Sequence, residues 1–69
     1  MKILILDDER QAITVLQSRL KRYTYVSDID FATNTKEGMS KMQQLHPNVL
    51  FLDVDLSEMS GLSFLKFID

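Results

Sequence analysis

The sequence predicts an α/β fold in which helices cover a small parallel sheet. Two short runs, residues 3–6 and 49–52, contain only apolar residues and are flanked by polar ones. Uninterrupted apolar runs of this length are typical of strands that are buried on both faces of a parallel sheet. Two segments with helical periodicity lie between the runs, which is the order expected for consecutive strand–helix–strand units.

The first helix is expected over residues 10–22, where the apolar residues fall on one helical face. These residues are Ala12, Ile13, Leu16 and Leu20. A second helix is expected over residues 36–45. Its apolar face consists of Met39, Met42 and Leu45. Asn34 and Glu37 have the spacing of a capping box before this helix, and Pro47 ends it.

Residues 26–32 predict a third strand, which is less apolar than the other two and is therefore expected at an edge of the sheet. A last helix is expected to begin near Ser60. Its apolar residues are Leu62, Phe64, Leu65 and Ile68. The predicted order is β-α-β-α-β-α, which implies parallel strands joined by right-handed crossovers.

Composition excludes several classes of protein. The chain has 69 residues, near the lower limit for one domain stabilised by apolar burial alone. A net charge of −2 and the lack of a suitable basic element argue against direct binding of nucleic acid. The absence of cysteine excludes disulfides and thiolate metal sites and fits a reducing cytoplasm. No apolar run is long enough for a transmembrane helix or a signal peptide, so we expect a cytoplasmic domain without membrane contact.

Acidic residues follow two of the three predicted strands. Asp7 and Asp8 come directly after the first apolar run, and Asp53 ends the second. An ionised carboxylate is costly to bury unless it is paired or binds a metal, and ligands of open parallel sheets bind at the carboxyl ends of the strands. Three carboxylates at one edge suit a hard cation such as Mg²⁺. The competing interpretation is that Asp8 only caps the helix that starts near Glu9.

The stretches "ILILDDE" and "VLFLDVDLSEMSGL" together resemble the receiver domain of two-component response regulators. The resemblance implies a flavodoxin-like (CheY-like) parallel sheet with five strands in the order 2-1-3-4-5. It covers the whole chain, 1–69, but only the first half of the family's domain. We therefore expect a truncated sheet in the order 2-1-3, without strands four and five.

The resemblance also implies roles for individual residues. Asp53 matches the aspartate that accepts the phosphoryl group. Asp8 matches a metal-binding carboxylate, and Asp7 its neighbour, which acts through water. Asp55 stands where the family supplies a metal ligand from the backbone carbonyl. Gly61 matches a glycine that lets the chain turn near the site.

The implied function is Mg²⁺-dependent transfer of a phosphoryl group to Asp53 from a histidine kinase or a phosphotransfer protein. A receiver promotes its own phosphorylation, so the label of enzyme is partly a matter of definition. The family also uses a Ser or Thr after strand four and a Lys after strand five, and neither falls within these 69 residues.

Two other functions compete with this one. "DVDLS" resembles the first motif of haloacid-dehalogenase-type phosphatases, with Asp53 as nucleophile and Asp55 as acid/base. That motif normally closes the first strand of its domain, whereas a full β-α-β-α unit precedes it here. The third possibility is a non-catalytic module. In the order 2-1-3 the apolar run 49–52 becomes an open edge, so we expect a homodimer through this strand and the last helix.

Overall fold

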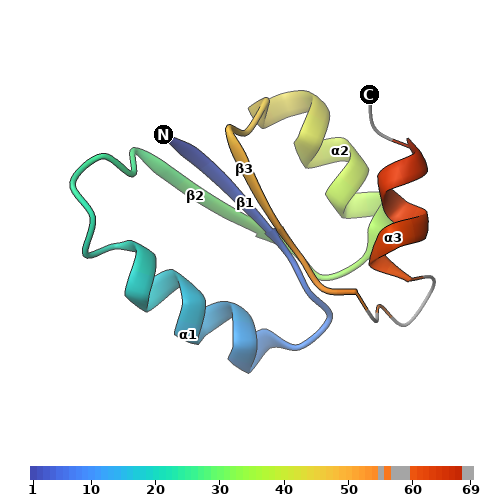
Figure 1. Cartoon of the computed structure of the whole chain (residues 1–69), viewed down its shortest axis with the longest axis horizontal. Helices are drawn as coiled ribbons and strands as arrows, with labels where there is room; N and C mark the ends of the chain where they lie inside the picture. Colours follow the sequence, from blue (N-terminus) through green and yellow to red (C-terminus); the bar gives the residue numbers. More distant parts are fainter. Residues whose placement is uncertain (55, 57–59, 68–69) are drawn as a thin grey trace.

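The computed structural model describes residues 1–54, 56 and 60–67, and it confirms the predicted α/β fold. The three strands form one parallel sheet in the order β2-β1-β3. Helix α1 covers one face of this sheet, and α2 and α3 cover the other (Figure 1). In chain order the elements are β1 (Lys2–Leu6), α1 (Arg10–Leu20), β2 (Asp28–Ala32), α2 (Thr35–Leu45), β3 (Val49–Leu52), α3 (Gly61–Phe64) and the 3₁₀ turn η1 (Leu65–Phe67).

The central strand β1 supplies the core of both layers, because its alternate side chains point to opposite faces of the sheet. On the α1 side the buried residues are Ile3, Ile5 and Ile13. On the α2 and α3 side they are Leu6, Ala32, Leu56 and Phe64. The prediction that the first apolar run is buried on both faces is confirmed.

Strand β3 differs from the prediction made for residues 49–52. We expected β3 to be buried on both faces, but its residues are only partly buried and Phe51 is 37% exposed. β3 pairs with β1 alone, and no strand pairs with its other side in the described residues. The predicted strand and its bounds are therefore confirmed, whereas the prediction that it is buried on both faces was wrong.

Helix α2 begins as the sequence predicts. The side-chain oxygen of Asn34 accepts a hydrogen bond from the N–H of Glu37 (2.8 Å), and the Glu37 carboxylate accepts one from Thr33 N–H (3.1 Å). The second bond goes one residue further back than in a standard capping box. The helix ends at His46, which has a left-handed backbone conformation (φ 49°).

Gly38 lies within α2, and the helix continues through it without a break. A Cβ at this position would lie 3.0 Å from a methyl carbon of Leu6 and 3.3 Å from the ring of Phe64. Glycine costs about 1 kcal/mol relative to alanine inside a helix. Here it lets α2 approach β1 and α3 closely.

The other differences are at element ends. Helix α1 stops at Leu20 rather than at residue 22. Strand β2 begins at Asp28 rather than at residue 26, because the N–H of Val26 bonds to the Tyr23 carbonyl in a turn (3.2 Å). The last helix is one turn of α-helix followed by a 3₁₀ turn, and Ile68, which we assigned to it, lies outside the described residues. No helix in the described ranges is long and apolar enough to cross a membrane.

Candidate acidic site at the carboxyl ends of the strands

Three aspartates meet where β1 and β3 end. Strands β1 and β3 run parallel with Leu6 opposite Leu52, so the residues that follow them emerge side by side. Asp7, Asp8 and Asp53 each offer a carboxylate oxygen, and these oxygens all lie within 4.8 Å of one another. All three residues are half-buried. The structure thus brings together the three carboxylates that the sequence analysis singled out.

Backbone hydrogen bonds hold this cluster in register. The N–H of Asp53 donates to the carbonyl of Leu6 (3.0 Å), which ties the end of β3 to the residue just before Asp7. The N–H of Asp7 donates to the carbonyl of Ala32 at the end of β2 (3.1 Å). The cluster is therefore fixed by all three strands of the sheet. Sequence reasoning missed these two carbonyls, because backbone groups leave no signal in residue type.

Asp7 has a second role in the turn before α1. Its carboxylate accepts a hydrogen bond from the N–H of Glu9 (2.9 Å). Glu9 itself is the N-cap residue, and its side chain makes no capping bond. The turn is thus built around Asp7 and Glu9, and Asp8 does not occupy the N-cap position. A carboxylate has two acceptor oxygens, so the bond to Glu9 leaves Asp7 able to serve a cation as well.

Gly61 brings the start of α3 against the backbone of Asp53. A Cβ on Gly61 would lie 2.1 Å from the Asp53 carbonyl oxygen and 2.9 Å from the Val54 Cα. The N–H of Gly61 donates to the Val54 carbonyl (3.0 Å), and Ser60 caps the helix by accepting a bond from Ser63 N–H (3.0 Å). The sequence analysis expected Gly61 to permit a turn. No glycine of the described residues has positive φ, so the requirement here is close approach.

The donor set suits a hard divalent cation. Three carboxylates in close proximity repel one another, and an ion such as Mg²⁺ relieves that repulsion while keeping some of its waters. Carboxylate oxygens are preferred by Mg²⁺, Ca²⁺ and Mn²⁺, whereas softer metals favour sulfur or imidazole. Asp55, whose carbonyl was assigned as a further ligand, lies outside the described residues.

Comparison with known proteins points in one direction. Residues 3–69 match the response regulator receiver domain. A protein-glutamate methylesterase/protein-glutamine glutaminase of Hydrogenovibrio crunogenus is 38% identical over 66 residues, which are 96% of this chain and 18% of that protein. An uncharacterized response regulatory protein of Vibrio cholerae is 36% identical over all 69 residues, 29% of its length.

A solved structure has the same arrangement of elements. The crystal structure of the response regulator domain of Thermotoga maritima CheB superposes with a TM-score of 0.89 at 25% identity. The match covers 99% of this chain and 51% of that chain. This chain therefore spans about half of that domain, and less than a third of the two curated relatives above.

Proposed function

This chain belongs to the response regulator receiver domain family, and on that premise we propose that it accepts a phosphoryl group on the carboxylate of Asp53. The observation that carries the proposal is the cluster of Asp7, Asp8 and Asp53, whose oxygens lie within 4.8 Å of one another at the ends of β1 and β3. Asp53 is half-buried, so an incoming donor can reach it while the neighbouring strands hold it in place.

The proposal includes Mg²⁺ as cofactor. Asp8 and Asp53 would bind it directly, Asp7 through water, and Asp55 through its backbone carbonyl. When bound, the cation offsets negative charge on the transferring phosphoryl oxygens. The three carboxylates supply the negative charge that holds it.

The chemical step is an in-line displacement at phosphorus. One carboxylate oxygen of Asp53 attacks, a new P–O bond forms, and the bond between phosphorus and the donor breaks. With a phosphohistidine donor the leaving group is the imidazole nitrogen, which keeps the electron pair. The product is an acyl phosphate on Asp53. A histidine kinase or phosphotransfer protein is accordingly the proposed partner.

The phosphatase alternative is disfavoured by the fold. Asp53 follows the third strand of the chain and not the first, and residues 3–69 match the receiver family throughout. We also propose that the 69-residue chain self-associates through β3 and the last helix, and two exposed apolar side chains support this. Phe51 on the open edge is 37% exposed, and Leu65 beside the last helix is 43% exposed.

Intact-mass measurement after incubation with acetyl phosphate and Mg²⁺ tests the phosphoryl transfer. We expect one added phosphoryl group, which is lost in Asp53→Asn and in the presence of a chelator. Asp28→Asn is the matched control, because Asp28 is exposed on β2 and pairs in register with Lys2, away from the cluster. No adduct on a folded sample, or an adduct that survives Asp53→Asn, would contradict the proposal.

A further inference from the structure

A side chain from α2 covers the outer edge of β2. This strand pairs with β1 on one side, and within the part of the chain that the structure describes no strand pairs with its other side. An open edge presents unpaired N–H and C=O groups, on which another strand can add. The partners of these groups therefore decide whether β2 can accept a further strand.

The hydrogen bonds to β1 show which groups of β2 face outward. The carbonyl of Ala32 accepts the N–H of Asp7 (3.1 Å), so Ala32 faces the side of β1. In a strand of a parallel ladder, the N–H and C=O of one residue point to the same side and those of the next residue to the opposite side. Phe31 consequently directs both of its groups to the open edge, and Ile29 does the same.

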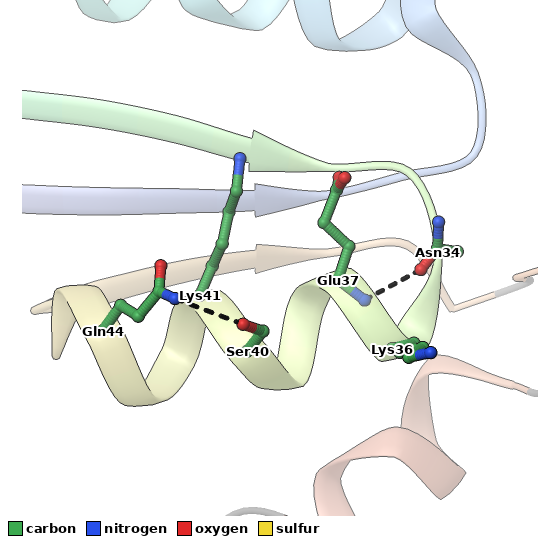
Figure 2. A pocket seen from close by; sticks show the side chains of 6 residues that line it. All are labelled: Asn34, Lys36, Glu37, Ser40, Lys41 and Gln44. Carbon is green, nitrogen blue, oxygen red and sulfur yellow. Dashed lines mark hydrogen bonds between the residues drawn. The ribbon is translucent and has the colours of Figure 1, made fainter.

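Both outward groups of Phe31 are occupied by side chains. Its N–H donates to Oδ1 of Asp30 (2.8 Å), and its carbonyl accepts a bond from Nζ of Lys41 (2.7 Å). The ammonium of Lys41 also donates to the same Oδ1 of Asp30 (2.8 Å). Figure 2 shows the Lys41 side chain rising from α2 to the end of β2. The result is a closed ring of three hydrogen bonds across the edge.

Contacts with the aromatic side chain of Phe31 support this cycle of hydrogen bonds. The Lys41 ammonium lies 5.3 Å from the centre of the Phe31 ring, and the guanidinium of Arg10 lies 5.9 Å from it. The side chain of Lys41 is 26% exposed and that of Asp30 is 43% exposed. A charge-assisted bond that is partly shielded from water is stronger than a fully exposed pair. Lys41 is thus held at the edge by its charge and by the aromatic ring.

We propose that Lys41 and Asp30 lock the outer edge of β2 against strand addition, and that the strand they exclude is β2 of a second copy of this chain. A two-fold axis beside an open edge lets the same strand of two copies pair with itself. With the lock in place, an incoming strand must displace Lys41 from the Phe31 carbonyl. It must also displace the Asp30 carboxylate from the Phe31 N–H. Lysine is a residue with which natural sheets protect their edges.

The test compares two lysines of one helix. Lys41→Met keeps an unbranched side chain and removes the ammonium. Lys36→Met makes the same charge change on α2, and Lys36 points away from β2 (Figure 2). Sedimentation velocity over a concentration series measures self-association. We expect the dissociation constant of Lys41→Met to be lower than that of Lys36→Met by roughly tenfold for each lock released, or about a hundredfold for the two locks of a dimer, with one charge-assisted hydrogen bond counted per lock.

Amide hydrogen exchange by NMR locates the contact. Association at the released edge should slow exchange of the Ile29 amide, because that N–H faces outward on β2. Lys41→Arg keeps the cation and should behave as the parent. If Lys41→Met does not fold, Asp30→Ala carries the same test, because it leaves the Phe31 N–H without its acceptor and the Lys41 ammonium without its carboxylate partner.

Equal dissociation constants for the two methionine variants would overturn the proposal. So would tighter association that protects the amide of Phe51 on β3 and leaves Ile29 unchanged. The lock contains no residue of the acidic cluster, so its test and the phosphorylation test succeed or fail independently.

Discussion

The two borders of the sheet are built in opposite ways. The border strand β2 is the more polar one, and Lys41 and Asp30 occupy the outward groups of Phe31. The border strand β3 is apolar, and Phe51 on it is 37% exposed. In the strand order 2-1-3-4-5 implied by the family, β2 is an edge strand, whereas β3 pairs with a fourth strand on its other side. The difference shows that the protected edge, β2, is the one at which the family's sheet ends.

A glycine in each of α2 and α3 lets that helix pack closely against its neighbours, and exchange of Gly61, beside the end of β3, gives the largest expected effect. Gly61→Ala puts a Cβ 2.1 Å from the carbonyl oxygen of Asp53, a contact with backbone that cannot yield cheaply. We expect a loss of about 2 to 3 kcal/mol in the free energy of unfolding, measured by urea titration.

Gly38→Ala on α2, the helix that carries Lys41, is the matched control. Its Cβ would meet a flexible methyl of Leu6 at 3.0 Å, and alanine also favours the helix. We expect its free energy of unfolding to stay within about 1 kcal/mol of the parent. A loss for Gly38→Ala as large as that for Gly61→Ala would show that the two glycines are equivalent.

A charge placed on β3 should make the two borders alike. Phe51→Lys introduces the kind of residue that protects β2, and we expect self-association of the 69-residue chain to weaken roughly tenfold. Phe51→Thr separates the two contributions, because it removes the aromatic ring without adding charge. Sedimentation velocity of the parent and both variants measures the effect. A parent that stays monomeric at high concentration would contradict association through β3.

Acid should weaken the β2 border and not the β3 border, and this is the smallest of the expected effects. Partial burial opposes ionisation of Asp30, but the hydrogen bonds from Lys41 and from the Phe31 N–H, together with the Lys41 charge, keep the pKa of Asp30 below its ordinary value of 3.8. A lowered folded-state pKa stabilises the protein above the unfolded-state value, and this stabilisation is lost as pH falls through the folded-state pKa.

The measurement is urea unfolding of the parent and of Asp30→Asn at pH 7 and below pH 3.8. The parent should be more stable than the variant at pH 7 by at most about 1 kcal/mol, because the pair is partly exposed to solvent. The difference should shrink below pH 3.8. A difference that grows on acidification would have the wrong sign for this ion pair.

Patterns within short segments could be predicted from the sequence. The apolar runs located β1 and β3, and the bounds of β3 were predicted without error. Asp7, Asp8 and Asp53 were predicted to converge, because parallel strands present their carboxyl ends at one edge. The start of β2 was misplaced, since Val26 is an apolar residue that packs against the core from a turn.

Contacts between distant elements could not be predicted in the same way. A glycine inside a helical segment indicates only a weaker helix. The benefit of Gly38 depends on Leu6 and Phe64, which no local pattern connects to it. The ring of Lys41, Asp30 and Phe31 was missed because a lysine on a helix and an aspartate on a strand are each common on surfaces. The available signal was a lysine on the helix that follows a polar edge strand.

Sequence distance gives the lock on β2 a kinetic consequence. Lys41 and Asp30 are 11 residues apart, whereas the backbone of Lys2 and the side chain of Asn48, which join β1 to the start of β3, are 46 apart. Closing a short loop is faster and costs less chain entropy than closing a long one. We therefore expect the β2 border to be shielded during folding before the last strand of the described sheet docks. The protein would then spend its most aggregation-prone interval with one of its two edges already closed.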